Sequence, residues 1–503
     1  FNGGSTTDAA NGTIAIGYTA GTNITTGSGN VAVGYRALNA CTTAGSNTVI
    51  GYDAALLLAG SDNSGADNVV VGYKALDAAT TNERQNVVIG SGAGGAIVGS
   101  ASDDNVLIGH NAGLGGGGTT EDCVVIGASA MDGTGTNTQT GTVAIGYFAL
   151  SELSSGAYNT VVGYKAGLLA TTSSSNTALG YEAFAMAGHD TVSNQNTCIG
   201  YKSGRSLGTG NSAHNNTLVG FDSGTAITIG DNNVAVGASA GVAITTGSDN
   251  IAIGKAAFDA NTVGVETIAI GTNALGTANE NDNDGSIAIG HNALAVQAGT
   301  GGNQFANANI GIGHSAGVAI TTGLRNVALG YNTMLETTVG DANIAIGYQA
   351  MLGDGAFQND SNIAIGSSHP TGPVLAAMGG QWSGAASLQN VAIGTGSMAG
   401  VMNDANNNTA VGYKSMAALT GGDSNVAVGS SAGLALTSAE NCVLLGTQAG
   451  AAIASNGNNI CIGSYAGADT DDAIVNATNN VYIGDSAGRY LDDGQNNTAV
   501  GYN

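Results

Sequence analysis

The sequence contains few cations, almost no proline and no long apolar stretch. Of its 503 residues, 10 are Lys or Arg, 35 are Asp or Glu and only two are Pro, and the formal net charge is −25 at pH 7. A nucleic-acid interface needs a basic stripe, and an anionic membrane surface would repel such a chain. No apolar run reaches about 18 residues, so no membrane-spanning helix is predicted. Because 43% of the residues are hydrophobic, disorder is not predicted either.

A short apolar segment that ends in glycine recurs from one end of the chain to the other. Its form is shown by Asn30-Val31-Ala32-Val33-Gly34-Tyr35, and 27 copies can be counted, with anchor glycines from Gly17 to Gly501. We call these anchors the motif glycines. Thirteen of the 26 intervals between them are 17 residues long, none is shorter, and the longest is 28. A fixed minimum with variable additions predicts one structural coil with loops inserted at its corners, which is typical of a solenoid.

The positions within the repeat predict a strand that is apolar on both faces. The residue before the motif glycine is always Ile, Val or Leu, and the residue three before it is always Val, Ile or Thr. These two residues share one face, and the residue between them, Ala in 15 copies, points to the other. A strand that is apolar on both faces is expected to be buried on both, and the small Ala is expected to allow close packing against its face.

Asparagine stands four residues before the motif glycine in 21 copies. Stacked coils would place these amides in a ladder that closes backbone groups at the turn. The representative ladder residues are Asn30, Asn47, Asn250, Asn343 and Asn425.

A second short strand is expected in each coil, most clearly in 20–30, 240–250 and 316–326, where Thr-Thr-Gly indicates a strand followed by a turn. No segment keeps a helical apolar period across the glycines. The prediction is therefore an all-β fold, a β-solenoid or parallel β-roll of about 27 coils that forms one continuous domain over 1–503. At roughly 4.8 Å per coil, such a stack would be about 130 Å long.

The motif N-[VIT]-A-[IV]-G resembles the head repeats of trimeric autotransporter adhesins, the YadA-like parallel β-roll. The longer form, shown by Asn343-Ile344-Ala345-Ile346-Gly347-Tyr348, also resembles repeats in tail fibres of phages and other large viruses. The resemblance covers nearly the whole chain. It implies a homotrimeric fibre whose Ala-lined faces pack at the three-fold axis. The minimum repeat of 17 residues is longer than the adhesin unit, and no coiled-coil stalk or membrane anchor is seen in the sequence.

The two ends of the sequence fall inside the repeat. By the repeat spacing, Phe1 would occupy the position after a motif glycine, and the last residues are Gly501-Tyr502-Asn503. We expect an excerpt of a longer fibre, and the alternative is a chain whose open ends stack into a filament.

Several matches to catalytic motifs are expected to be structural. The pattern G-x-S-x-G occurs at 313–317, 237–241, 429–433 and 484–488, but its Ser takes a repeat position that elsewhere holds Lys, Asn, Asp or Gln. The chain is therefore predicted not to be an enzyme, and no catalytic, cofactor-binding or metal site is predicted.

The histidines, cysteines and acidic turns are interpreted in the same way. His110, His291 and His314 stand directly after a motif glycine, where Tyr stands in 12 copies, and are expected to stack in its place. The five cysteines form no C-x-x-C pair and are expected to be small buried residues. The segment 280–285 begins like a calcium loop but lacks the closing Glu, and 469–472 is a second acidic turn. Solvated turns are expected at both, with marginal Ca²⁺ binding as the alternative.

One insertion breaks the pattern. The loop at 367–390 contains both prolines and the only tryptophan. A rigid loop with an amphipathic aromatic is typical of a binding surface, so contact with a receptor or glycan is one interpretation; the other is that the loop seals a defect in the roll and buries the Trp. The candidate contact residues are His369, Pro370, Pro373 and Trp382.

Taken together, the residues predict an extracellular structural or adhesive fibre on a virion or cell surface, with copies of itself and a host glycan or protein as partners. Rigidity and multivalent reach would be its mechanism. The alternative is a self-assembling end-to-end filament or matrix protein, and a polysaccharide-cleaving tailspike is a third possibility, disfavoured because the acidic residues sit in variable loops rather than in a fixed groove.

Overall fold

The structure is a computed structural model, and each of its two compact units, Phe1–Asp249 and Asn250–Asn503, is considered by itself. The residues that the structure describes are 12–59, 65–80, 83–97, 102–115, 118–135, 137–185, 192–209, 212–277, 284–297, 308–353, 358–368, 375–380, 382, 384–468, 477–490 and 494–502.

Each coil contributes one strand of three residues that ends directly before its motif glycine. Branched residues favour this extended backbone, and the glycine ends it. In the first unit the strands are β1 (Ile14–Ile16), β2 (Val31–Val33), β3 (Thr48–Ile50), β4 (Val69–Val71), β5 (Val87–Ile89), β6 (Val106–Ile108), β8 (Val124–Ile126), β10 (Val143–Ile145), β11 (Thr160–Val162), β12 (Thr177–Leu179), β13 (Thr197–Ile199), β14 (Thr217–Val219) and β15 (Val234–Val236).

In the second unit the strands are β16 (Ile251–Ile253), β17 (Ile268–Ile270), β18 (Ile287–Ile289), β19 (Ile310–Ile312), β20 (Val327–Leu329), β21 (Ile344–Ile346), β22 (Ile363–Ile365), β23 (Val391–Ile393), β24 (Thr409–Val411), β25 (Val426–Val428), β26 (Val443–Leu445), β27 (Ile460–Ile462), β28 (Val481–Ile483) and β29 (Thr498–Val500). The described residues of both units contain no helix.

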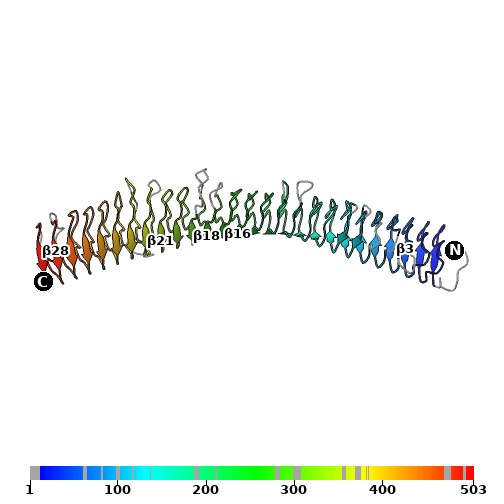
Figure 1. Ribbon diagram of the computed structural model, residues 1–503, viewed down its shortest axis with the longest axis horizontal. Helices are drawn as coiled ribbons and strands as arrows, with labels where there is room; N and C mark the ends of the chain where they lie inside the picture. Colours follow the sequence, from blue (N-terminus) through cyan, green and yellow to red (C-terminus); the bar gives the residue numbers. More distant parts are fainter. Residues whose placement is uncertain are drawn as a thin grey trace. The chain divides into compact units, whose positions relative to one another are not determined.

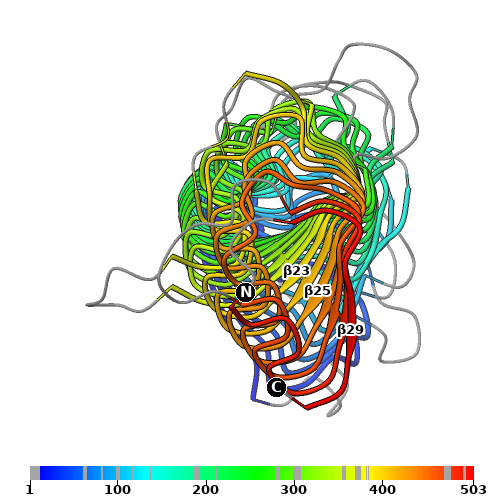
Figure 2. The same ribbon diagram turned by 90° about the vertical axis from the view of Figure 1, so that its left-hand side faces the viewer.

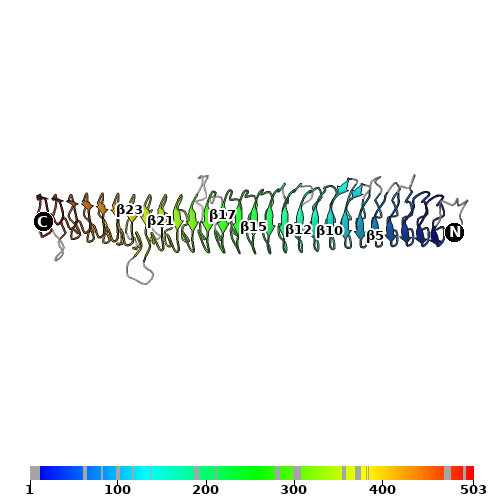
Figure 3. The same ribbon diagram turned by 90° about the horizontal axis from the view of Figure 1, so that it is seen from below.

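Within each unit every strand pairs in parallel with the strand of the next coil. The register matches repeat position to repeat position, so that Ala32 lies between Ala15 and Val49. Figure 1 shows this succession for β16, β18 and β21, and Figure 3 shows it for β5, β10 and β12. Seen along the stack, each coil winds once around the interior with its strand on one side, as β23, β25 and β29 illustrate in Figure 2. The predicted all-β parallel solenoid is therefore confirmed for each unit.

The motif glycine is required by both its backbone and its surroundings. Gly163 has φ +147°, and a Cβ on it would collide with the carbonyl oxygen of Gly180 in the next coil. The same collision recurs at the motif glycines along each unit, because successive corners stack directly on each other. A side chain at this position would push two coils apart.

The expected second strand is wrong for most coils. The segment 20–30 forms turns, and the N–H groups of Thr25 and Thr26 both donate to the carbonyl of Thr42, at 2.8 and 3.2 Å. A strand alternates the direction of its hydrogen bonds, and this pattern does not. The described exception is one local pair, β7 (Thr120–Glu121) with β9 (Gln139–Thr140).

The interior of each coil is filled by the middle strand residue and by the residue four positions after the motif glycine. Their sizes compensate. Where the middle residue is large, as Leu218 is, its partner is glycine, and a Cβ on Gly224 would lie 2.6 Å from Leu218 Cδ2. Where the partner is large, as Leu150 is, the middle residue is usually Ala, here Ala144, and both are fully buried.

Candidate functional site: the outer face, its rim and the polar ladders

The outer face of the strands is apolar and open in the single chain. We define the outer columns as the residues one and three positions before each motif glycine. From β2 to β28 the middle residue of every three-residue strand is buried, whereas the two flanking residues are half-buried or exposed. Leu179 is 49% exposed, and Leu329 is 41% exposed. No charged residue occurs in either column of the sequence.

This geometry corrects the expectation that Ala-lined faces form a seam between chains. Ala32, Ala144 and Ala252 are fully buried inside their own coils and cannot touch another chain. The coil is narrow, so the small residue is needed inside it, and the branched residues point outward. On this side of the coil, only the outer columns are open to another chain.

The asparagine ladder runs through the described coils of each unit. Asn47 is fully buried, and its backbone N–H and Nδ2 donate to Asn30 Oδ1 at 3.0 and 3.2 Å. Asn343 donates in the same way to Asn326 Oδ1, and Asn425 to Asn408 Oδ1. The Nδ2 groups of Asn343 and Asn425 also donate to turn carbonyls of the next coil, those of Asn359 and Ala439, which pairs backbone groups that would otherwise be buried without partners.

Asn250 occupies the first ladder position of the second unit. Its Nδ2 donates to Gly264 O at 2.7 Å, and its Oδ1 accepts the Thr267 N–H at 3.0 Å. Thr267 replaces the ladder amide in that coil, as Cys442 does elsewhere, and the backbone N–H of each still donates to the preceding asparagine. The ladder therefore tolerates replacement by small side chains, even in two consecutive coils, as at Thr267 and Ser286.

A second polar column was not expected from the sequence. It lies six residues before the motif glycine and runs in the opposite sense. The Leu324 N–H donates to Asp341 Oδ1 and the Asp341 N–H to Asp360 Oδ1, both at 2.8 Å, and the His214 N–H donates to Asp231 Oδ1 at 2.6 Å. Asp, Asn, Ser, Gly and Leu all occupy this position, so no single residue type signalled it.

Aromatic residues stack along the edge of the outer face. We call the position directly after each motif glycine the rim. Tyr18, Tyr35, Tyr52 and Tyr73 form one run, with ring centroids 4.8 to 5.5 Å apart. A longer run of five rings has neighbouring centroids 5.1 to 5.6 Å apart and comprises Tyr147, Tyr164, Tyr181, Tyr201 and Phe221.

The rim histidines behave as the sequence predicted where a neighbouring ring is available. His291 stacks on His314 at 4.9 Å, and His314 stacks on Tyr331 at 4.8 Å. The rim also carries Lys255 and Asp485, in contrast to the outer columns. Tolerance of both charges indicates that the rim stays in contact with solvent.

The G-x-S-x-G serines share one backbone conformation with unrelated residues. Ser239 and Ser315 have φ of 56° and 53°, and Lys165 at the same repeat position has φ of 52°. Ser315 Oγ lies 3.1 Å from Nδ1 of the adjacent His314. The described segments after these serines contain no helix, which a nucleophile elbow requires.

The loop at 367–390 is described only in part. His369, Pro370 and Pro373 lie outside the described residues. Trp382 is 1% exposed, so the indole contributes no contact surface in this structure and fits the interpretation in which the loop buries it. Receptor contact by the other three residues stays a prediction.

The cysteine thiols are free and buried. Burial raises the pKa of Cys41 and of Cys123 to about 11 and that of Cys461 to about 12.

Of the expected acidic turns, 469–472 and most of 280–285 lie outside the described residues. Among the residues that the structure does describe, no group of three or more His, Cys, Asp or Glu is arranged to hold a metal ion.

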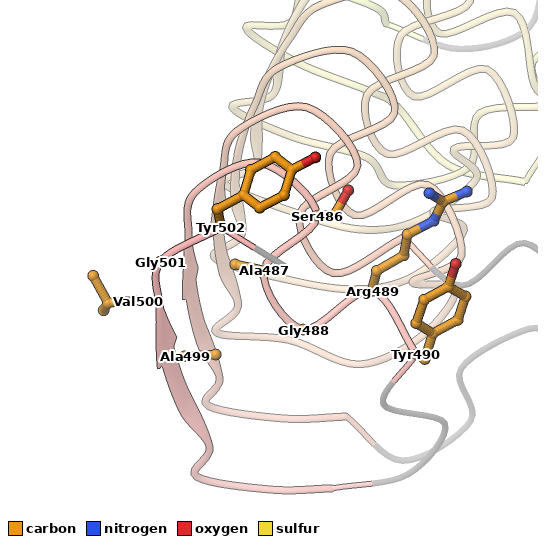
Figure 4. A pocket seen from close by; sticks show the side chains of 9 residues that line it. All are labelled: Ser486, Ala487, Gly488, Arg489, Tyr490, Ala499, Val500, Gly501 and Tyr502. Atoms are coloured by element: carbon orange, nitrogen blue, oxygen red, sulfur yellow. The ribbon is translucent and has the colours of Figure 1, made fainter.

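A hollow of about 360 Å³ lies against the last described coil. Ser486, Arg489, Tyr490 and Tyr502 are among its lining residues, and Figure 4 shows the Val500 side chain pointing away from them. The Arg489 guanidinium lies 4.6 Å from the ring centroid of Tyr465 and 5.4 Å from that of Tyr490. The lining residues belong to 486–490 and 499–502, and they include no acid–base pair.

In the described part of the chain, no helix is long and apolar enough to cross a membrane. No protein-family model matches the chain, and no curated protein matches it.

Proposed function

We propose that the protein is a structural fibre that assembles with copies of itself through the outer columns. The observation that carries this proposal is an apolar parallel sheet that is covered on its inner face and open on its outer face. Parallel sheets occur almost only with both faces covered, and large exposed apolar patches mark interaction sites.

The occupant of the face is a second copy of the same chain. The face repeats once per coil, at the spacing of adjacent strands, and a partner must offer the same repeat to fit along its length. A symmetric copy does so automatically, because homo-oligomers bring identical surfaces together. The absence of charge from both columns suits such a dry contact, since an unpaired buried charge is costly.

Three copies per assembly is the arrangement implied by the resemblance to trimeric adhesin and tail-fibre repeats. That resemblance also supports an extracellular location, on a virion or a cell surface, and an adhesive role in which a rigid shaft presents repeated contacts. The role is mechanical rather than catalytic: inter-coil hydrogen bonds and the amide ladder supply the stiffness.

Charge substitution on the outer face tests the proposal. A triple variant, Val162→Lys, Leu179→Lys and Ile199→Lys, places cations on three successive outward positions that are not buried in the single chain. The coil should still form, while assembly should weaken by at least about tenfold because each buried cation lacks a partner. Sedimentation velocity over a concentration series measures the change.

The matched control places the same charges on the rim. Ser91→Lys, Ala128→Lys and Ala238→Lys repeat what Lys255 does naturally, so assembly should be unchanged. Equal assembly of both triple variants would refute the outer columns as the seam. Loss of circular dichroism in the first variant would show instead that these side chains serve the coil itself.

A further inference from the structure

The aromatic run on the rim of the first unit presents a regular array of ring edges. It consists of Tyr147, Tyr164, Tyr181, Tyr201 and Phe221, one from each of five successive coils. Neighbouring rings from Tyr147 to Phe221 are tilted by only 6° to 18°, and each is 40% to 54% exposed.

Stacking decides which part of each ring is accessible. The faces of the inner rings are covered by their neighbours, so their edges and phenol oxygens meet solvent. Phe221 ends the run, and the next rim residue is Ala238, so no further ring covers its outer face. The surface therefore offers a row of phenol hydroxyl groups, closed at one end by an open aromatic face. The hydroxyl of Tyr181 already pairs with Glu182 and that of Tyr201 with Lys202.

Charged residues of opposite sign alternate beside the rings. Lys165, Glu182, Lys202 and Asp222 follow four successive rings, so that cations and anions alternate along the row. The ammonium of Lys202 lies 5.0 Å from the ring centroid of Tyr201, and Arg205 bridges Glu182 at 3.2 Å. Lys165, Lys202 and Arg205 outweigh Glu182 and Asp222 by one charge, which is too little on a chain of net charge −25 to attract a polyanion, so the row favours a neutral, hydroxyl-rich ligand.

The spacing of the row selects the form of that ligand. Consecutive centroids from Tyr164 to Phe221 are 5.1 to 5.2 Å apart. An extended peptide advances by about 3.3 Å per residue and would lose register after one step. An extended β-1,4-linked polysaccharide advances by nearly the same step per sugar as the rings do, whereas α-linked glucans coil.

We propose that this run binds an extended, neutral β-1,4-linked polysaccharide lying parallel to the stack of coils, with one sugar per ring. The inference rests on the proposed function only in that the rim stays open to solvent in the assembly. The first run, from Tyr18 to Tyr73, repeats the arrangement with Arg36, Asp53 and Lys74 beside it and supplies a second, weaker site.

The test is native affinity electrophoresis of the assembled protein in gels that contain soluble hydroxyethyl cellulose, with dextran as the α-linked comparison. The variant is Tyr164→Ala, Tyr181→Ala and Tyr201→Ala. Alanine stands naturally at this position in Ala128 and Ala238, so the coil accommodates it. The control is Tyr413→Ala, which removes an exposed ring that stands between Thr395 and Ser430 on the rim.

The unmodified protein should be retarded by hydroxyethyl cellulose but not by dextran. That retardation should be at least about tenfold weaker in the triple variant and unchanged in Tyr413→Ala. No retardation of the unmodified protein, equal retardation by dextran, or retardation that the triple substitution leaves undiminished would each overturn the proposal. A changed assembly mass in the triple variant would also overturn it, because another copy would then cover the rim. The mass of the unmodified assembly tests the proposed function separately.

Discussion

Replacing one inner asparagine of the ladder should loosen two adjacent coils locally. In the structure, Asn176 Nδ2 donates to Asn159 Oδ1 at 3.2 Å and to Ser193 O at 2.9 Å. Its Oδ1 accepts the backbone N–H of Asn196 at 2.9 Å. Asn176→Ala therefore removes the side-chain partner of the Ser193 carbonyl and of the Asn196 N–H, both of which belong to buried residues.

The magnitude follows from these two backbone groups. A buried group that loses its partner costs about 1–3 kcal/mol, so Asn176→Ala should cost about 2–6 kcal/mol in local stability. Because each 1.36 kcal/mol is a factor of ten, the amide hydrogen exchange of Asn196 should accelerate by about 30-fold to 26,000-fold. Global unfolding is a poorer readout, since a repeat array of this length need not unfold in one step.

Hydrogen exchange resolved by peptide mass spectrometry gives the local measurement. The control is Asn137→Ala, which removes an exposed amide that donates to Ser154 O at 3.3 Å, and it should leave exchange nearly unchanged. If Asn196 exchanged at the same rate in Asn176→Ala as in the unmodified chain, the ladder would not hold the coils together.

Three further predictions concern the core and one titrating group. Gly224→Leu should overpack the coil against Leu218 and cost about 1–3 kcal/mol of stability, seen as a lower urea midpoint, while the double variant with Leu218→Ala should recover most of the loss by restoring the small–large pairing of other coils. Gly163→Ala should destabilise more than Gly224→Ala, because the new Cβ meets the Gly180 carbonyl in the first variant and the flexible end of the Leu218 side chain in the second. Thermal unfolding of these two single variants compares them. Desolvation raises the pKa of Asp259, whose Oδ1 has no hydrogen-bond partner, so its stabilising contribution is present below the unfolded pKa and lost as the pH rises through the folded pKa. Asp259→Asn should therefore raise the melting temperature at pH 7 and leave it unchanged at pH 3, and an equal rise at both values would contradict this sign.

The repeat spacing predicted the architecture because every coil obeys the same steric rule. A glycine whose Cβ would collide with the next coil leaves a fixed mark in the sequence, and the residue directly before it is always Ile, Val or Leu. The asparagine ladder was predictable for a related reason: a buried turn amide must be paired in each coil, and Asn does so in most of them.

The orientation of the strand could not be predicted from the same pattern. Both faces are apolar, so polarity does not distinguish inside from outside. The small size of Ala32 and its equivalents was taken as a sign of close packing between chains, whereas it reflects the narrow interior of one coil. The compensation between the middle residue and the position four after the glycine, seen in Leu218 and Gly224, carries the correct signal.

The second polar column and the missing second strand escaped prediction because they depend on backbone geometry. At the first, Asp341 and Asp360 accept from the backbone of the preceding coil, and many residue types fill the position. In place of the second strand, the N–H groups of Thr25 and Thr26 share one carbonyl acceptor, and residue identities alone do not reveal this.

The most direct test of the central claim is the native mass of the unmodified chain, measured by native mass spectrometry and by light scattering across a concentration series. An apolar outer face that serves as a seam predicts a discrete multiple of the 48.7 kDa chain, with three copies as the expected number. A stable, soluble single chain at micromolar concentration would contradict the claim, because the outer columns would then stay open to water with no partner.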